Sequence, residues 1–258
     1  MRIATWNING LRARLELVKR WLIERQPDVV GFQELKTQTE EFPHDAFLEI
    51  GYHALVHGEK AWNGVAILTR APAELVQTGL PAQDGFGSRL ITARIQDLEF
   101  TTVYCPNGKT LDHADYQRKL SWFESLTAHW QNQQRAPAAV LCGDFNIVPT
   151  PLDGWQGTKA DGEIFHTVAE RERFSALMDT GLTDLFRHHS PDEQAYSWWD
   201  YRGGAFHKRH GLRIDLILGT PAVRDRLDAI YIDREYRKKQ GELTASDHAP
   251  VVAEIRKP

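Results

Sequence analysis

Short apolar runs of strand length recur along the whole of this chain, and only a few helical stretches separate them. Several neighbouring runs are joined by short turns, whereas each pair of parallel strands needs a long crossover connection. A purely parallel sheet is therefore excluded, and we expect two packed mixed β-sheets with helices on the outside. The predicted strands are residues 2–7, 28–33, 64–69, 90–95, 99–104, 138–143, 195–199, 213–218, 228–233 and 250–255.

The helical stretches are amphipathic. Apolar side chains recur every three or four residues over 11–22, which predicts a helix that ends at Pro27. The same spacing predicts a helix over roughly residues 113–131 and another that ends near Gly181. Pro221 is placed to start a short helix between two strands. A weak internal echo is also visible, because WNING and GDFNI each follow a strand with a polar turn.

Composition limits the kind of protein that this chain can form. Of its 258 residues, 41% are hydrophobic and 26% charged, which excludes a disordered chain. At about 150 residues per domain the length allows one or two domains. Because no Ser- or Gly-rich linker interrupts the pattern, we expect one domain over residues 1–258. The net charge of −4 excludes overall basicity as a basis for nucleic-acid binding, but it leaves a local basic face possible.

The distribution of apolar residues also bears on location. No apolar run approaches the roughly 18 residues of a membrane-spanning helix, and MRIATWNING lacks the apolar stretch of a signal peptide. These features predict a cytoplasmic protein without a membrane partner. Cys105 and Cys142 lie in apolar runs, so we expect buried free thiols and neither a disulfide nor a zinc site.

Polar side chains end or interrupt the apolar runs at seven positions. Taken singly, each has an ordinary explanation as a turn former, a solvated rim residue or part of the packing. Asp215 is harder to explain in this way, because it lies within RIDLIL and a buried carboxylate needs a donor or a cation. Strand ends converge in space, and oxygen ligands suit Mg²⁺ or Mn²⁺ better than zinc. The seven positions are Asn7, Glu34, Tyr104, Asp144, Asn146, Asp215 and His248.

Six motifs spread along the chain carry a resemblance to a known family. They are, in order, WNINGLRAR, QELK, YCPNG, GDFNI, GLRIDLIL and SDHAPV. Any one of them alone is weak, but with all six in order the chain resembles the bacterial exonuclease III family of DNA-repair nucleases over roughly residues 1–256. That family belongs to the deoxyribonuclease I-like endonuclease/exonuclease/phosphatase superfamily. The resemblance implies a four-layer α/β sandwich with the active site at one edge of its two sheets.

The resemblance also implies roles for the polar residues. Asp144 would accept the proton of the attacking water, and a cationic His248, oriented by Asp215, would donate to a phosphate oxygen. Whether Tyr104 acts as a neutral donor or as an ionised group, and whether one metal ion or two take part, stays open at this stage. The implied catalytic residues are Tyr104, Asp144, Asn146, Asp215 and His248. The implied candidate ligands of Mg²⁺ or Mn²⁺ are Asn7, Glu34, Asp144, Asn146, Asp247 and His248.

The segment 196–215 interleaves aromatic and cationic residues, as base stacking and phosphate contact require. A solvated loop over an aromatic core is the alternative. By resemblance, Trp198, Leu212 and Ile214 would line an apolar pocket for a base-less sugar. Arg89 is a weaker candidate, since it could equally form a surface salt bridge. The expected DNA-contacting residues are Asn107, Gly108, Lys109, Trp198, Arg202, Phe206, Lys208, Arg209, Leu212 and Ile214.

One segment departs from the family pattern. Many family members have a small residue where this chain has EIFH at residues 163–166. A ring of Phe165 or His166 against the sugar pocket would disfavour an abasic nucleotide while leaving the trimming of 3′ ends intact. Alternatively, Phe165 packs in the core and His166 faces solvent.

The function implied by the resemblance is that of a Mg²⁺-dependent DNA-repair phosphodiesterase. It would act as a monomer on double-stranded DNA, cutting at abasic sites and removing nucleotides or phosphates from 3′ ends. One alternative is a 3′ exonuclease and 3′ phosphatase with weak abasic-site incision. Two further alternatives are a superfamily phosphatase for lipid or inositol phosphates and a non-catalytic nucleic-acid-binding relative. The phosphatase would be expected to carry membrane-directed loops, and the binding protein to have lost some of the seven polar residues.

Overall fold

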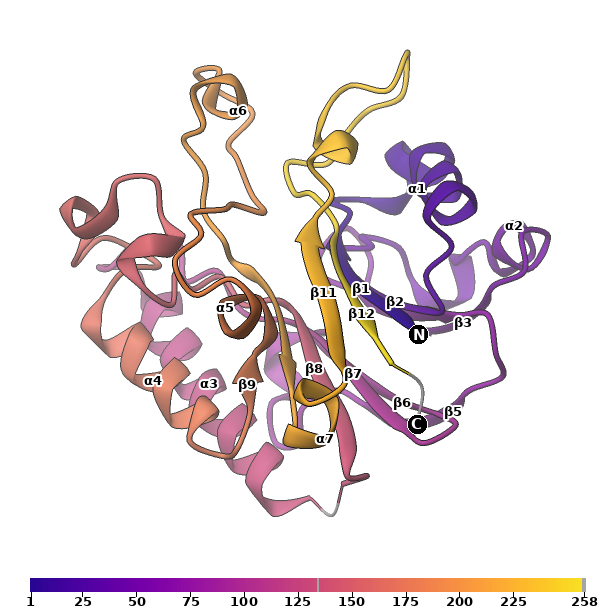
Figure 1. Ribbon diagram of the computed structural model, residues 1–258, viewed down its shortest axis with the longest axis horizontal. Coiled ribbons are helices and arrows are strands. Elements are labelled where there is room, and N and C mark those ends of the chain that lie inside the picture. Colours follow the sequence, from indigo (N-terminus) through magenta and orange to yellow (C-terminus); the bar gives the residue numbers. More distant parts are fainter. Residues whose placement is uncertain (134, 257–258) are drawn as a thin grey trace.

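Two six-stranded sheets form the centre of the computed structural model, which describes residues 1–133 and 135–256 (Figure 1). The first sheet has the order β11-β12-β1-β2-β4-β3 and the second β5-β6-β7-β8-β10-β9. The strands of the first sheet are β1 (Arg2–Asn7), β2 (Val29–Gln33), β3 (His53–His57), β4 (Val65–Thr69), β11 (Leu227–Ile232) and β12 (Val251–Ile255). Those of the second are β5 (Glu74–Thr78), β6 (Leu90–Ile95), β7 (Leu98–Tyr104), β8 (Ala138–Asp144), β9 (Thr183–Asp184) and β10 (Asp215–Gly219).

The two sheets repeat one pattern of pairing. In the first, β1 runs parallel to β2 and antiparallel to β12. In the second, β8 runs parallel to β7 and antiparallel to β10. All the other strand pairs are antiparallel, so both sheets are mixed, as predicted. The echo between WNING and GDFNI has this structural basis, because the two motifs lie at the ends of the corresponding strands β1 and β8.

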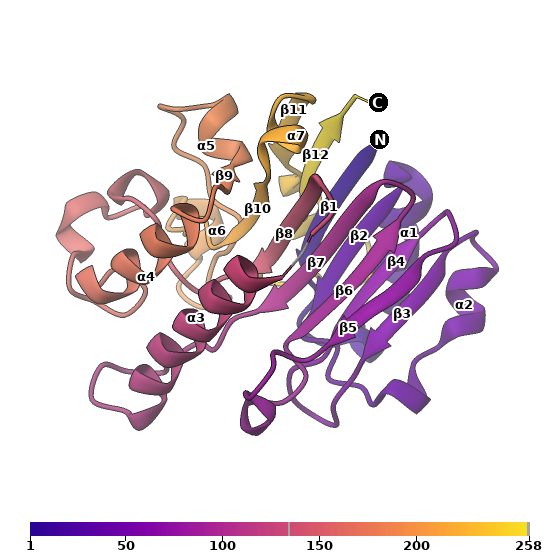
Figure 2. The same ribbon diagram turned by 90° about the horizontal axis from the view of Figure 1, so that it is seen from below.

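Helices cover the outer face of each sheet (Figure 2). α1 (Leu11–Arg25) and α2 (His44–Leu48) pack on the first sheet, and α3 (Ala114–Asn132) and α4 (Val168–Met178) pack on the second. Shorter helices lie in the connections, namely α5 (Leu185–His189), α6 (Ala205–Lys208) and α7 (Pro221–Arg224). The predicted four-layer sandwich is therefore confirmed. Among the described residues no helix is both long enough and apolar enough to cross a membrane.

Alternation along β1 shows how the sequence builds these layers. Ile3 packs in the apolar cluster between the sheets, whereas Ala4 and Trp6 pack beneath the helices of the first sheet. Side chains point to opposite faces at successive strand positions, so one strand serves both layers. α1 ends at Gln26, which adopts the left-handed conformation directly before Pro27, as the predicted boundary requires.

The sheets approach each other closely near the end of β2. A Cβ atom on Gly31 would lie 2.5 Å from Thr102 Oγ1 of β7, so only glycine fits there without displacing the facing strand. Beside it, Gln33 Nε2 donates to Thr5 Oγ1 at 2.9 Å and to Thr102 Oγ1 at 2.7 Å. This small polar contact ties the two sheets together next to the edge that carries the polar residues.

Two sets of secondary-structure predictions need correction. Residues 195–199 form no strand, because Trp198 makes only isolated bridges to Leu212 and His248. The edge strands β3 and β5 were not predicted, since β3 is only half-buried and β5 is largely exposed, so neither gives a buried apolar run. Cys105 and Cys142 are buried free thiols, as expected.

Strand register brings the polar residues to one edge. Asn7 lies opposite Gln33, which directly precedes Glu34, and Asp144 lies between Tyr104 and Asp215. β12 runs antiparallel to β1, so the residues before β12 reach the same edge. In Figure 1 this edge faces upward, and α6 and the loop before β12 project beyond it.

Candidate active site

Asn7 lies between two carboxylates that come from different sheets. Its Nδ2 donates to Glu34 Oε1 and to Asp144 Oδ2, both at 2.9 Å. Asn7 is fully buried, and its Oδ1 accepts from the backbone N–H of Asn9. The side chain is therefore fixed, and it holds Glu34 and Asp144 at a set separation.

Glu34 follows β2 in a left-handed conformation, with φ of 52°. The turn is stabilised by backbone hydrogen bonds from Gly10 N–H to Glu34 O and from Leu35 N–H to Gly64 O. Lys36 Nζ lies 2.9 Å from Glu34 Oε2. These contacts aim the carboxylate at Asp144 instead of letting it extend into solvent.

His248 and Asp215 form a buried pair. Nδ1 of His248 lies 2.9 Å from Asp215 Oδ2, and its Nε2 lies 3.9 Å from Asp144 Oδ2. Ser246 Oγ accepts from the backbone N–H of His248 and fixes the loop. Burial by itself would lower the pKa of the imidazole, but the Asp215 carboxylate outweighs it and raises the pKa of His248 to about 10. The ring is thus a cation near neutral pH, with Nδ1–H donating to Asp215 and Nε2–H on the side of Asp144.

Asp144 is buried where β8 ends. Its Oδ1 accepts from the backbone N–H of Asn146 at 2.9 Å, and its Oδ2 faces Asn7 and His248. Burial raises the pKa of Asp144 to about 7, against the lowering effect of the nearby His248 cation. A carboxylate that takes and releases a proton near neutrality suits a general base.

The turn after β8 fixes Asn146. This residue has φ of 49°, and its Nδ2 donates to Cys105 O at 3.0 Å. Asn107 Nδ2 donates to Asn146 Oδ1 at 3.2 Å, so the loop after β7 reaches the turn after β8. Below this contact Lys119 Nζ donates to Asn146 O at 2.7 Å.

Tyr104 lies beside the carboxylates under the guanidinium of Arg89, which sits 4.8 Å from its ring centroid. Burial and the nearby Glu34 carboxylate hold the pKa of the Tyr104 phenol well above its usual value. Both effects favour the neutral form of the Tyr104 hydroxyl. Arg89 donates to the carbonyls of Phe86 and Tyr104, so its guanidinium binds backbone beside the site.

The donor set fits a hard divalent cation. One ligand atom each from Glu34, Asp144 and His248 lies within 4.8 Å of the others. The imidazole in its protonated form has no free lone pair, which leaves the Glu34 and Asp144 carboxylates as the stronger ligands. Asn7, a predicted ligand, presents its Nδ2 to these carboxylates and its Oδ1 to the backbone of Asn9. Burial is the main cause of the raised pKa of Asp144, and the nearby carboxylates of Asp215 and Glu34 add to it.

Asp247, a predicted ligand, lies slightly apart. Its Oδ2 accepts from Trp198 Nε1 at 3.0 Å, and its Oδ1 accepts from Asn9 Nδ2 at 2.8 Å. Burial acts to raise the pKa of Asp247, but the His248 cation and these donors hold it below its usual value. In the structure this carboxylate orients the indole of Trp198 and is not part of the cluster formed by Glu34, Asp144 and His248.

The expected sugar-pocket residues do come together. Trp198, Leu212 and Ile214 form one apolar cluster with Val148, and the ring of Trp198 lies 6.5 Å from that of His248. Phe165 packs against the same cluster. This pocket cluster, meaning these five apolar residues, is therefore adjacent to His248.

The two residues of the unusual EIFH segment lie in different surroundings. Phe165 is partly buried at the pocket cluster, with φ of 71° and Lys119 Nζ 4.8 Å from its ring centroid. His166 is only 4% exposed, and its Cε1 would lie 2.8 Å from a Cβ atom on Gly154. The alternative in which His166 faces solvent is wrong.

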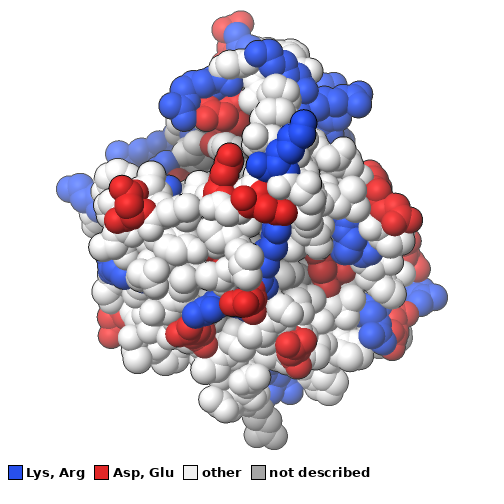
Figure 3. Space-filling model, turned by 90° about the vertical axis from the view of Figure 1, so that its left-hand side faces the viewer, with Lys and Arg blue, Asp and Glu red and all other residues white. Residues whose placement is uncertain are grey.

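The remaining predicted DNA contacts divide into two groups. Asn107 and Lys109 are exposed beside the site, with the buried Gly108 between them at φ of 89°. Arg202, Lys208 and Arg209 are exposed around α6. In Figure 3 lysine and arginine side chains gather on this projecting end of the molecule. Phe206 instead packs against Trp199, 5.0 Å away, in a separate aromatic cluster.

A buried ion pair beneath the site was not predicted. Lys119 Nζ lies 2.5 Å from Glu170 Oε1, and both side chains are fully buried. Glu170 also accepts from Thr167 in a capping box that begins α4. The T-x-x-E spacing of that box is visible in the sequence, and so is a lysine on the apolar face of α3. The two signals together could have pointed to the pair.

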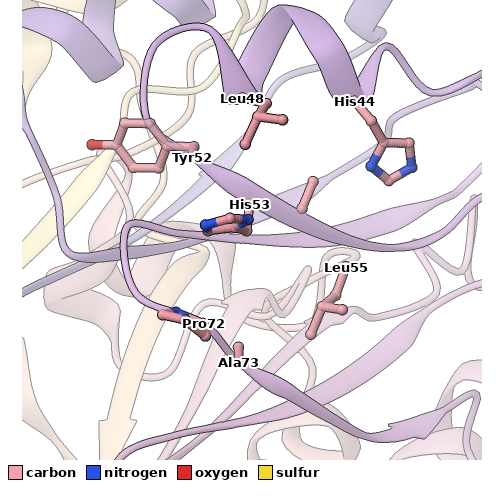
Figure 4. Close-up of a pocket in the computed structure, with 8 residues that line it drawn as sticks. His44, Leu48, Tyr52, His53, Leu55, Pro72 and Ala73 are labelled. Atoms are coloured by element: carbon pink, nitrogen blue, oxygen red, sulfur yellow. The ribbon is translucent and has the colours of Figure 1, made fainter.

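A cavity of about 350 Å³ lies away from this site, at the edge of the first sheet (Figure 4). It is lined by α2, β3 and the segment before β5, and no carboxylate is among its lining residues. The Tyr52 hydroxyl donates to Pro27 O at 2.9 Å and is not free to bind a ligand. Its ionisable lining residues are His44, His53 and Tyr52, and none of them belongs to the acidic cluster described above.

The fold and the buried acidic site together define a class. The family model described as Endonuclease/Exonuclease/phosphatase family matches residues 4–248, and the chain belongs to this family. Within it, the chain is 32% identical to the Exodeoxyribonuclease III of Haemophilus influenzae, over 99% of this chain and 100% of that protein. The predicted likeness to the exonuclease III type is confirmed.

Two solved structures agree closely with the whole chain. The 3′ phosphatase NExo from Neisseria, a variant bound to a product DNA hairpin, is 39% identical, with a TM-score of 0.95 and 100% of both chains covered. The AP endonuclease from Archaeoglobus fulgidus is 35% identical, with a TM-score of 0.93 and 99% of both chains covered.

Proposed function

We propose that this protein is a metal-dependent nuclease that hydrolyses phosphodiester bonds in double-stranded DNA, at abasic sites and at 3′ ends. The observation that carries the proposal is the convergence of Asn7, Glu34, Asp144, Asp215 and His248 at one sheet edge. The names of the three relatives support it, since they denote an exodeoxyribonuclease, a 3′ phosphatase and an AP endonuclease. All three reactions hydrolyse a phosphate ester at a DNA sugar, so one site can serve them.

Asp144 is the general base in this proposal. With a pKa raised to about 7 it is largely ionised at the slightly alkaline pH where it would take a proton from water. Asn7 donates to its Oδ2 and the backbone N–H of Asn146 donates to its Oδ1, so the carboxylate keeps its orientation while it accepts the proton.

The cationic and neutral donors act on the phosphate. His248 presents Nε2–H toward the space beside Asp144, and Asp215 is a positioning residue that keeps the ring charged. The neutral phenol of Tyr104 and the amide of Asn146 are further donors at the same edge. Mg²⁺ or Mn²⁺ bound at the Glu34 carboxylate would supply positive charge to the phosphoryl oxygens.

The balance between the reactions forms a second part of the proposal. Phe165 occupies a place in the pocket cluster beside Trp198, where an extruded abasic sugar would have to enter. A frayed 3′ terminus can approach without leaving a continuous strand, whereas an internal nucleotide must be flipped out. We therefore expect work at 3′ ends to predominate over abasic incision.

Three labelled duplexes test the proposal. One carries an internal abasic site, one a recessed 3′ end and one a 3′ phosphate. The protein should process all three with Mg²⁺, fastest at the 3′ ends, and should lose all three reactions with a chelator. Asp144→Asn is the matched control for a contaminating nuclease, since it keeps the shape of the site. Lack of cleavage of every duplex by the folded wild type would refute the proposed function.

A further inference from the structure

Trp62 is the most exposed of the large hydrophobic side chains, at 71%. It lies in the loop between β3 and β4, on the rim of a cavity of about 280 Å³. The same cavity is lined by Tyr104 and Asn107, so it borders the candidate active site. An aromatic face left in water at the mouth of a catalytic site is an unusual use of a tryptophan.

The loop that carries Trp62 is held firmly. Glu59 Oε2 accepts from the side chain of Asn63 at 3.0 Å and from the backbone of Ser88 at 2.9 Å. Asn63 O accepts from the backbone N–H of Lys36, two residues beyond Glu34. The loop that carries the indole of Trp62 is thus hydrogen-bonded to the segment that follows Glu34. Because the loop is already ordered, little conformational entropy would be lost if a ligand stacked on the indole.

Positive charge lines the opposite wall of the cavity. Lys109 Nζ and Arg118 NH1 share one carboxylate, that of Asp115, at 2.7 and 3.2 Å. Arg89 also lines the cavity, so three cations and one anion leave a net charge of +2. The guanidinium of Arg118 also lies 4.6 Å from the ring centroid of Phe86, which keeps it at the cavity.

We infer that this cavity binds an unpaired nucleotide of the DNA next to the scissile phosphate. Its base would stack on Trp62, and its backbone phosphate would lie against Arg118 and Lys109. Exposed aromatic faces combined with cations are the usual means of binding single-stranded nucleic acid. The inference rests on the proposed function, and it adds a substrate preference: ends with unpaired nucleotides should bind more tightly than blunt ends.

Fluorescence anisotropy with three labelled duplexes, with a chelator to prevent cleavage, tests the preference. One duplex is blunt, one has a frayed, mismatched 3′ end, and one has a recessed 3′ end that leaves the complementary strand unpaired. The last two show which strand supplies the nucleotide. Trp62→Ala should weaken binding of at least one unpaired end by about tenfold and of the blunt duplex by less than about twofold. Trp62→Phe should retain most of the affinity, and Arg118→Gln should reduce the salt dependence of binding.

Leu48→Ala is the matched control, because Leu48 is 54% exposed on α2 and lies far from the active-site cavity in the fold. If folded Trp62→Ala bound all three duplexes as tightly as the wild type, this inference would be overturned. Cleavage by the wild type would still support the proposed function in that case. An equal loss on all three duplexes would also overturn the preference. A wild type that neither binds nor cleaves DNA would overturn both.

Discussion

Replacing Phe165 by glycine separates a gating role at the pocket cluster from simple packing. Truncation of a fully buried phenylalanine costs about 3–5 kcal/mol, and a partly buried ring costs roughly half of that. Phe165 also has φ of 71°, where glycine recovers about 1 kcal/mol of backbone strain. The net loss is therefore about 1 kcal/mol, which lowers Tm by about 2–4 °C in a protein of this size and leaves the fold intact.

The activity of the variant should change in a specific direction. Without the ring, the space beside Trp198, Leu212 and Ile214 can admit an abasic deoxyribose. The ratio of kcat/KM for abasic incision to kcat/KM for 3′ exonuclease action should rise at least several-fold, measured on matched duplexes with one preparation of folded protein. His166→Ser is the companion variant, and we expect a smaller effect because His166 packs against Gly154 and is not a member of the pocket cluster. An unchanged ratio in both folded variants would refute gating by this segment.

Three further predictions concern the catalytic groups. Asp144→Asn should lower turnover by about 10² or more while DNA binding survives or tightens, and a variant with over a tenth of normal turnover would assign the base elsewhere. The rate should rise with pH as Asp144 ionises near 7 and fall as His248 loses its proton near 10. Asp215→Asn should move the alkaline limb of that profile to lower pH, and an unmoved limb would show that His248 is not the titrating acid. Chelation should abolish cleavage yet leave cooperative thermal unfolding essentially unchanged, and Glu34→Gln should raise the metal concentration needed for half-maximal activity more than it weakens DNA binding.

The sequence predicted the central strands well because they are buried on both faces. β8, for example, is an unbroken apolar run that ends in Asp144. β5 is exposed at four of five positions, so its hydrogen bonding to β6 left no pattern in composition. A polar residue directly after a buried strand can be recognised in the sequence. The residues of the candidate site could therefore be predicted.

What those polar side chains bind was less predictable. Asp247 and Asp144 are both acidic residues at the same edge, yet one holds an indole and the other lies among Glu34 and His248. That difference depends on the position of Trp198. The neighbours of Trp198 lie in loops without regular structure, so its position could not be predicted from a sequence pattern. Lys119 and Glu170 are 51 residues apart and lie on different helices, so neither local pattern alone could reveal their pairing.

Because Gly31 packs closely against Thr102, the geometry of the active site depends on the distance between the two sheets. Glu34 follows the strand of Gly31, and Asp144 ends the strand that pairs with that of Thr102, so the Asn7 bridge spans the seam between the sheets. A methyl group at position 31 would push the two sheets apart. The distance between the carboxylates of Glu34 and Asp144 would then increase, although the methyl group would contact neither of them. Conversely, a cation bound between these two carboxylates would hold the two sheets together. Catalytic geometry in this protein is thus tuned partly by a residue that has no side chain and never meets the substrate.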